Sequence, residues 1–203
     1  MADDHIVRDV ADLEAIYGAP SEASLVKVAP RLTPLYAKWI MASRLCVIST
    51  VGVEGTDGSP RGDDGPVAQM PDDKTLLIPD WRGNNRMDTL RNIVEDGRIS
   101  LMFFVAGSHN VIRVNGTAVV SLDPALTRRF KDKGQLPRSV IVVTVAEVYS
   151  QCARALMRAG IWSGDKAPGD LPTIGALLAE QKDGFDGAAY DAAWADRAKE
   201  TMW

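Results

Sequence analysis

The stretch Pro79-Asp80-Trp81-Arg82-Gly83-Asn84-Asn85-Arg86 joins two segments of different periodicity. The apolar run before it, at 75–78, is typical of a buried strand. The spacing of Met87, Leu90 and Val94 after it predicts a helix over about 86–95. A helix start presents unpaired backbone N–H groups and the positive end of the helix dipole. With two arginines beside that start, the stretch predicts a site for a phosphate monoester.

The same turn also has a purely structural interpretation. Asn84 or Asn85 can cap the following helix, and Asp88 is placed for a capping-box-like return bond. The arginines would then simply be solvated. Arg82 and Arg86 nevertheless carry the fork-shaped donors that match phosphate oxygens. Both interpretations remain open from these residues alone.

Composition narrows the class of protein. The 203 residues are 46% hydrophobic and 25% charged, enough for one sizeable core. A net charge of -4 argues against general binding of nucleic acid or anionic membranes. Cys46 and Cys152 lie far apart, which predicts reduced thiols in a cytoplasmic setting. The acidic N-terminus lacks the apolar core of a signal peptide, and no apolar run approaches the roughly 20 residues that span a bilayer.

Periodicity predicts a core of strands flanked by helices. Helices are expected at 6–17, 33–43, 86–95, from 123, 147–160 (at least from 151), 173–181 and 188–200. Strands are expected at 45–50, 75–78, 99–105, 111–121 and 140–145, with a further segment at 67–70 and a hairpin connection at 52–58. About six strands in meander order, without βαβ alternation, favour a small antiparallel barrel over a Rossmann sheet.

Three other places carry candidate side chains. In 59–63, Arg61 fits either a surface loop or a phosphate contact, and Gly62 would let the backbone approach a planar ligand. Arg113 shares a strand face with Val111 and Asn115, so it faces solvent, a cleft or a subunit interface. A cluster of aromatic and basic residues follows the last predicted strand: Tyr149, Arg154, Arg158 and Trp162. These residues fit either an amphipathic helix or a contact with the ligand of a neighbouring subunit.

The familiar catalytic motifs are missing from the sequence. His5 and His109 lack metal-ligand spacing with the cysteines, so we expect no metal site. The chain contains no nucleophile elbow, Walker A loop or Rossmann fingerprint. Redox or group-transfer chemistry would therefore come from a cofactor.

Seven short motifs, taken in order, resemble one family. They are Ser59-Pro60-Arg61-Gly62-Asp63, Pro79 to Arg86, Arg91-Asn92-Ile93, Arg98-Ile99-Ser100-Leu101, Arg113-Val114-Asn115-Gly116, Pro137-Arg138-Ser139 and Gln151-Cys152-Ala153-Arg154-Ala155-Leu156. Over about residues 30–162 the chain resembles the FMN-binding split-barrel proteins related to pyridoxamine 5′-phosphate oxidase. Within them it is most similar to the branch of predicted flavin-nucleotide-binding proteins.

The resemblance implies a mainly β, α+β fold: a six-stranded antiparallel split β-barrel with peripheral helices. The barrel would span 31–162, between an N-terminal helical extension (1–30) and a C-terminal one (163–203) on the barrel or the dimer partner. It also implies a homodimer that holds FMN at the subunit interface. The implied cofactor-binding residues are Ser59, Arg61, Gly62, Asp63, Ile78, Pro79, Asp80, Arg82, Asn84, Asn85, Arg86, Asn110, Arg113, Tyr149 and Arg158. Of these, Tyr149 is placed as the partner subunit's contribution, and Asn110 and Arg113 would often contact the flavin across the dimer.

The sequence also departs from the oxidase. After Arg61 it has Gly62-Asp63-Asp64-Gly65-Pro66, where the oxidase has an apolar strand ending in lysine. The oxidase's substrate-binding residues have no convincing counterparts, and no general base stands out. We therefore expect an FMN-dependent oxidoreductase of unknown substrate. A non-catalytic flavin carrier or sensor, or a barrel that uses deazaflavin or haem, remains the alternative.

Overall fold

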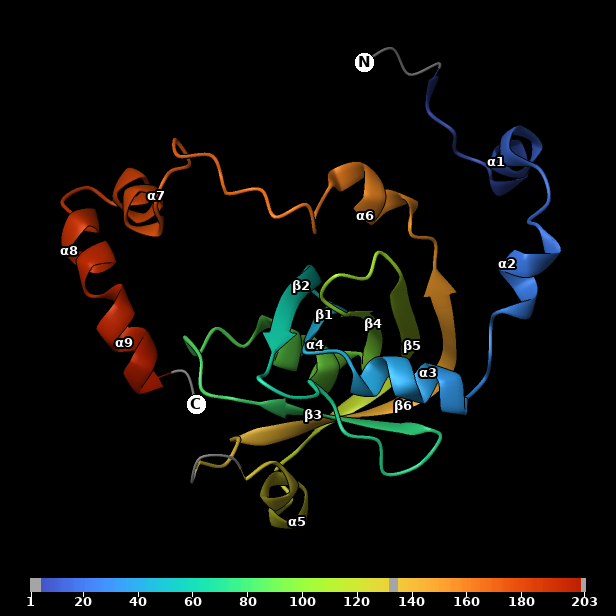
Figure 1. Ribbon diagram of the computed structural model, residues 1–203, viewed down its shortest axis with the longest axis horizontal. Helices are drawn as coiled ribbons and strands as arrows, with labels where there is room; N and C mark the ends of the chain where they lie inside the picture. Colours follow the sequence, from blue (N-terminus) through green and yellow to red (C-terminus); the bar gives the residue numbers. More distant parts are fainter. Residues whose placement is uncertain (1–4, 132–134, 202–203) are drawn as a thin grey trace.

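The computed structural model describes residues 5–131 and 135–201 and is built around one curled, six-stranded antiparallel sheet (Figure 1). The strand order is β2-β1-β4-β5-β6-β3. The strands are β1 (Leu45–Gly52), β2 (Gly55–Gly62), β3 (Thr75–Asp80), β4 (Arg98–Phe104), β5 (Val111–Ser121) and β6 (Ser139–Gln151). The sheet closes halfway into a barrel and leaves β2 and β3 as its two edges, so the expected split barrel is confirmed.

The inner face of the sheet forms the main core. Along β1 and β4, buried and partly exposed residues alternate, as the period of a strand requires. Ile48, Leu101 and Phe103 are at most 1% exposed. Helix α4 (Asp88–Glu95) contributes Ile93 to the same cluster. One continuous core therefore includes residues of β1, β3, β4, β5 and β6, whereas β2 reaches the site described below through its pairing with β1.

A bulge bends the two longest strands. The register between β5 and β6 shifts at Asn115/Gly116, so Asn115 faces Glu147 while Gly116 faces Val145. At Gly116 the backbone of β6 comes so close that a Cβ atom would lie 2.0 Å from the carbonyl oxygen of Thr144. Only glycine fits this crossing without moving the strand.

Two of the helix starts follow local rules that the sequence displays. Helix α3 (Pro34–Met41) is capped by the Thr33 side chain, which accepts a hydrogen bond from the backbone N–H of Tyr36. Helix α5 (Pro124–Thr127) is capped in the same way by Asp123, and a short 3-10 helix, η2 (Arg128–Phe130), follows it. In each case proline occupies the first helical position, where its fixed φ suits the helix and its missing N–H costs no bond.

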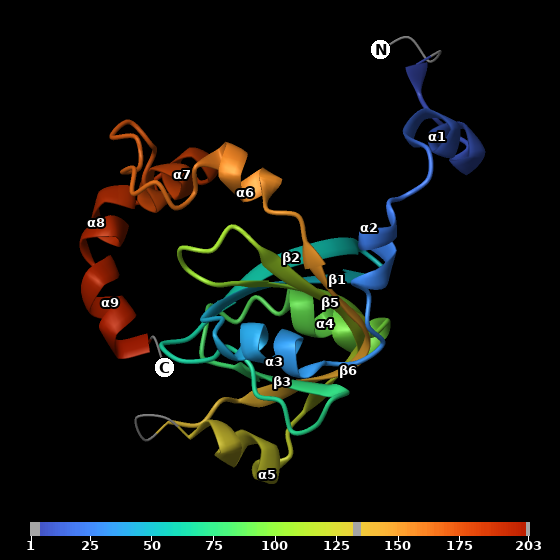
Figure 2. The same ribbon diagram turned by 45° about the vertical axis from the view of Figure 1, so that its right-hand side comes forward.

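The chain ends extend beyond the barrel (Figures 1 and 2). The N-terminal arm carries α1 (Val10–Tyr17) and α2 (Glu22–Val26), in which no residue is buried. The C-terminal part carries α6 (Arg154–Ala159), α7 (Ile174–Gln181), α8 (Gly187–Ala192) and α9 (Trp194–Thr201). In the described part of the chain, no helix is long and apolar enough to cross a membrane. The proposed division into three regions remains a prediction.

Two expectations about strand order and extent were wrong. The strands do not form a simple meander, because β1 pairs with β4 and β3 pairs with β6. The hairpin expected at 52–58 is present, but its connection is only Val53-Glu54, since β1 runs to Gly52 and β2 starts at Gly55 and pairs with β1 along its whole length. Local glycine content predicted a connection there, but the ladder of backbone hydrogen bonds with β1 stabilises a strand instead.

Other helix and strand limits also differ. Residues 147–151 belong to β6 rather than to a helix, because they pair with Val111 to Asn115 of β5. Residues 67–70 form only an isolated bridge, between Gln69 and Leu77. The first helix begins at Val10 rather than residue 6, and α2 had no prediction.

Candidate functional site

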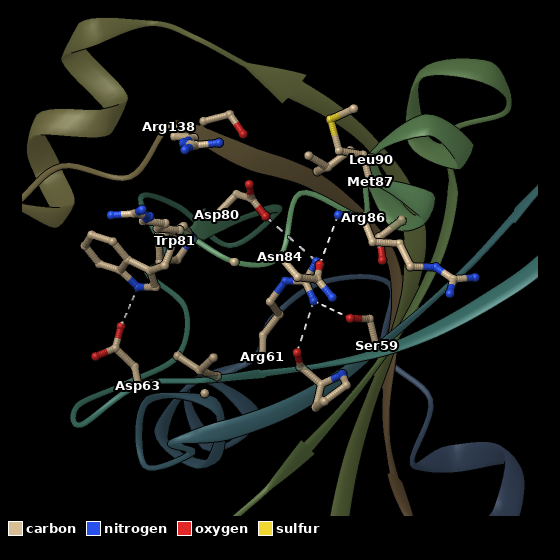
Figure 3. A pocket seen from close by; sticks show the side chains of 18 of the residues that line it. Ser59, Arg61, Asp63, Asp80, Trp81, Asn84, Arg86, Met87, Leu90 and Arg138 are labelled. Carbon is tan, nitrogen blue, oxygen red and sulfur yellow. Dashed lines mark hydrogen bonds and ion pairs between the residues drawn. The ribbon is translucent and has the colours of Figure 1, made fainter. Parts of the chain in front are cut away.

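A pocket of about 740 Å³ lies at the open side of the split barrel and takes residues from both edge strands. Figure 3 shows it from close by, with β2 below and the loop after β3 behind. The lining residues are Arg44, Ser59, Pro60, Arg61, Gly62, Asp63, Asp64, Val67, Pro79, Asp80, Trp81, Arg82, Gly83, Asn84, Asn85, Arg86, Met87, Thr89, Leu90, Val120, Leu122, Arg138 and Ser139. Its size is that of an ordinary small-molecule or cofactor site.

Arg61 is the best-held cation of the pocket. It lies in β2 rather than in a loop, directly opposite the buried Cys46. Its Nη1 donates to Ser59 Oγ and to the carbonyl oxygen of Pro60, and its Nη2 lies 3.8 Å from Asp80 Oδ1. The Arg61 side chain is 22% exposed. This guanidinium is therefore oriented before any ligand arrives, with part of its surface facing the pocket.

Burial governs the ionisation of two groups beside Arg61. The pKa of Asp80 is raised, chiefly because burial removes water from its carboxylate, although the charges of Arg61 and Arg138 oppose the rise. Burial also raises the pKa of the Cys46 thiol to about 12, against a smaller opposing effect of Arg61. Cys46 is thus an unreactive core residue, and Asp80 is the carboxylate at the centre of the pocket.

The turn after β3 is stabilised by side chains rather than by the helix cap that we considered. Helix α4 begins at Asp88, and Met87 at its N-cap makes no side-chain hydrogen bond. Asn84 Oδ1 accepts from the backbone N–H of Arg86 at 3.0 Å. Asn85 has a φ of 60° and is the one non-glycine with positive φ among residues 5–131 and 135–201. The two asparagines therefore shape the turn and do not cap α4.

The exposed arginines of the turn differ from Arg61. Arg86 Nε donates to Asp88 Oδ2 at 2.5 Å, and the Arg86 side chain is 79% exposed. This contact raises the pKa of Arg86, and Figure 3 shows its guanidinium directed away from Arg61 and Asp80. Arg82 is exposed and lines the pocket. Arg61 is therefore better placed than Arg86 to bind an anion inside the pocket.

An apolar wall faces these polar groups. Trp81 donates from its indole Nε1 to Asp63 Oδ2 at 3.1 Å and so connects the loop after β2 to the end of β3. Val67, Leu90 and Val120 add aliphatic surface to the lining. The pocket can thus take a ligand that combines an anionic group with a flat, largely apolar part.

Most of the predicted site residues meet in this pocket, whereas five lie away from it. Ser59, Arg61, Gly62, Asp63, Pro79, Asp80, Arg82, Asn84, Asn85 and Arg86 line it together. Ile78, Asn110, Arg113, Tyr149 and Arg158 do not, and Ile78 is a fully buried core residue. The role of these five residues remains a prediction.

Arg113 and Tyr149 lie together on the outer face of the sheet. They are opposite one another in the β5–β6 ladder, and the Arg113 guanidinium lies 5.2 Å from the centre of the Tyr149 ring. Arg113 Nε is buried, and no hydrogen-bond partner is present for it in the described residues. A buried donor of this kind normally has a partner.

Sequence reasoning missed five polar residues of the pocket, of which two, Arg44 and Asp64, adjoin predicted segments. Ser139 begins β6 opposite Asp80 in the β3–β6 ladder, and Arg138 directly precedes it. Thr89, in α4, donates from its hydroxyl to Asp57 of β2. Arg138-Ser139 did belong to a motif shared with the family, which was the available signal, but nothing in the sequence placed it near Asp80.

The comparisons with known proteins identify the family. The family model described as pyridoxamine 5′-phosphate oxidase matches residues 32–152. HupZ from Group A Streptococcus is 20% identical, with a TM-score of 0.49 over 59% of this chain and 99% of that one. A putative pyridoxamine 5′-phosphate oxidase from Lactobacillus delbrueckii is 21% identical (TM-score 0.47; 60% and 95% covered).

The FAD binding protein from Mycobacterium smegmatis is 12% identical, with a TM-score of 0.41 over 61% of this chain and 97% of that one. No curated protein matches the chain. The family model covers more than half of the 203 residues, in the segment that folds into the split barrel. The chain therefore belongs to the pyridoxamine 5′-phosphate oxidase family.

Proposed function

We propose that this protein binds FMN in the pocket between β2 and β3 and works as a flavin-dependent oxidoreductase in a cytoplasmic setting. The observation that carries the proposal is the meeting, in one cavity, of Arg61 with the turn that follows β3. These two segments belong to separate family motifs, and the resemblance assigns both to the flavin phosphate.

The residues of the pocket fit the phosphate end of FMN. Arg61 is oriented by Ser59 and Pro60 and keeps part of its surface exposed to the cavity. Met87 and Thr89 also line the cavity, so the start of α4 adds the positive end of a helix dipole. A phosphate held here would lie against fixed positive charge.

The remaining lining fits the rest of the cofactor. Val67, Leu90 and Val120 offer apolar surface to an isoalloxazine ring. The Asp80 carboxylate can accept hydrogen bonds from hydroxyl groups of a ribityl chain. Bound FMN would supply hydride or electron transfer, and these side chains would hold the ring and limit its contact with water. The substrate is not assigned.

We further propose that the working unit is a homodimer. Arg113 Nε is a buried donor without a partner in the described residues, and Tyr149 lies beside it on the outer sheet face. A second copy of the chain, or the flavin that it holds, would supply the missing acceptor. This arrangement would give Asn110, Arg113 and Tyr149 the cross-subunit roles that the resemblance implies.

The first test is the absorption spectrum of the purified protein and its titration with FMN. We expect a flavin spectrum and FMN binding that Arg61→Ala weakens by roughly 1.5–3 kcal/mol, the contribution of a charge-assisted hydrogen bond. Arg98→Ala is the matched control, because Arg98 pairs with Asp96 and does not line the pocket. Protein that stays colourless with FMN would contradict the proposal, and a deazaflavin or haem spectrum would replace FMN.

Anaerobic mixing with NAD(P)H and candidate substrates separates the oxidoreductase from its alternative. Bleaching of the flavin with turnover supports the enzyme. Tight FMN binding with no reduction by any donor would instead support a non-catalytic carrier or sensor.

A further inference from the structure

Arg138 connects the start of β6 to the segment that joins β3 to α4, at Asp80 and at Asn85. Its Nη1 donates to Asn85 Oδ1 at 2.8 Å, across 53 positions of sequence. Its backbone N–H donates to the carbonyl oxygen of Asp80 at 3.2 Å. Arg138 itself lines the pocket. The residue directly before β6 therefore holds the segment between β3 and α4 through a main-chain bond and a side-chain bond.

The Asn85 end of this connection is a strained position. A φ of 60° places Asn85 in the left-handed region, which residues with a Cβ atom adopt at a cost. Asparagine tolerates that region better than most residues, but it usually needs surrounding contacts to remain there. The hydrogen bond from Arg138 is such a contact. The next backbone N–H, that of Arg86, donates to Asn84 Oδ1, so the shape of the turn depends on two side-chain bonds.

We propose that Arg138 is a positioning residue for the phosphate site. By holding Asn85 in the left-handed conformation, it fixes the turn at 83–86 in the shape that receives the anion. The inference rests on the proposed function in one respect, namely that the anion is the phosphate of a flavin nucleotide. Preforming the turn removes part of the conformational cost of binding, so the benefit appears as affinity for the phosphorylated ligand.

The first experiment compares FMN with riboflavin, which lacks the phosphate. Arg138→Met keeps the length of the side chain but removes its charge and donors. We expect on the order of a tenfold weaker FMN binding, with riboflavin binding unchanged. Arg129→Met is the matched control, because Arg129 Nε also donates to an amide oxygen, Gln69 Oε1, outside the pocket. An equal loss for both ligands would overturn the proposal.

A double-mutant cycle tests the route through Asn85. Glycine adopts positive φ without strain and lacks the amide that Arg138 contacts. In the Asn85→Gly background, Arg138→Met should therefore cost no further affinity for FMN. A loss of the same size in both backgrounds would show that Arg138 acts directly on the ligand and would overturn the positioning role.

Amide hydrogen exchange in the flavin-free protein supplies a readout that does not need the ligand. We expect Arg138→Met to accelerate exchange at Arg86, whose N–H donates to Asn84 Oδ1, while the midpoint of unfolding stays close to that of the Arg129→Met control. Unchanged exchange would overturn the inference. Faster exchange in a protein that fails to bind FMN would leave the inference standing and remove only the flavin assignment.

Discussion

The inner and outer faces of β1, β4 and β5 differ in how completely the residues of one chain bury their apolar side chains and pair their polar groups. On the inner face, Ile48, Leu101 and Val114 are fully buried in a continuous apolar core. On the outer face, Met102 and Phe104 remain partly exposed beside Arg113, whose Nε is buried without a partner in the described residues. The same strands thus carry a closed apolar core on one side and, on the other, the surface that we propose a second chain covers.

The largest expected effect is a difference in stability loss between alanine substitutions at two neighbouring phenylalanines, Phe103 and Phe104. Phe103 is 1% exposed on the inner face, and Phe104 is partly exposed on the outer face. Phe103→Ala should lower the free energy of unfolding by about 3–5 kcal/mol, because it leaves a cavity in the core. Phe104→Ala should cost clearly less, as measured by urea denaturation of dilute protein. Equal losses would show that the outer face is as well buried as the core.

The next prediction concerns the unsatisfied arginine. If a second chain supplies the acceptor for Arg113, Arg113→Ala should weaken the dimer by about 1.5–3 kcal/mol while the monomer still folds. Sedimentation velocity over a dilution series measures this, with Arg98→Ala as the control at an exposed arginine of the neighbouring strand. A wild-type protein that is monomeric at every concentration would show that no second chain covers the outer face.

The smallest expected effect is the contribution of Asp80, at the end of β3, to the pH dependence of stability. The folded-state pKa of Asp80 is raised by burial, so the native state binds this proton more tightly than the unfolded chain. As the pH falls through the folded pKa toward the unfolded value of 3.8, the wild type should gain stability relative to Asp80→Asn. Urea midpoints of the flavin-free proteins at several pH values measure that difference. A wild type that loses stability relative to Asp80→Asn as the pH falls would contradict the assignment.

The features that the sequence could predict are those with local causes. Thr33 before Pro34 and Asp123 before Pro124 act as helix caps because the capping bond spans only two or three residues. The family motifs also placed Arg61 and the turn after β3 in one site, where the structure has them.

The features that the sequence could not predict depend on distant partners. Residues 147–151 looked helical locally, but they are strand because β5 lies beside them. Arg138 reaches Asn85 only because β6 pairs with β3, so no nearby pattern in the sequence indicated the contact. Neither composition nor periodicity predicts the left-handed conformation of Asn85.

The glycine at the bulge also has a consequence for how this sequence can change. Gly116 admits no side chain, so it fixes the alignment of β5 against β6 at one point. Arg113 lies three residues before it, and each shift of one residue along a strand exchanges the two faces. An insertion between them would therefore turn Arg113 toward the apolar core, whereas an insertion in the loop before β5 would not. The distance between these two residues is accordingly far less free to vary than the length of that loop.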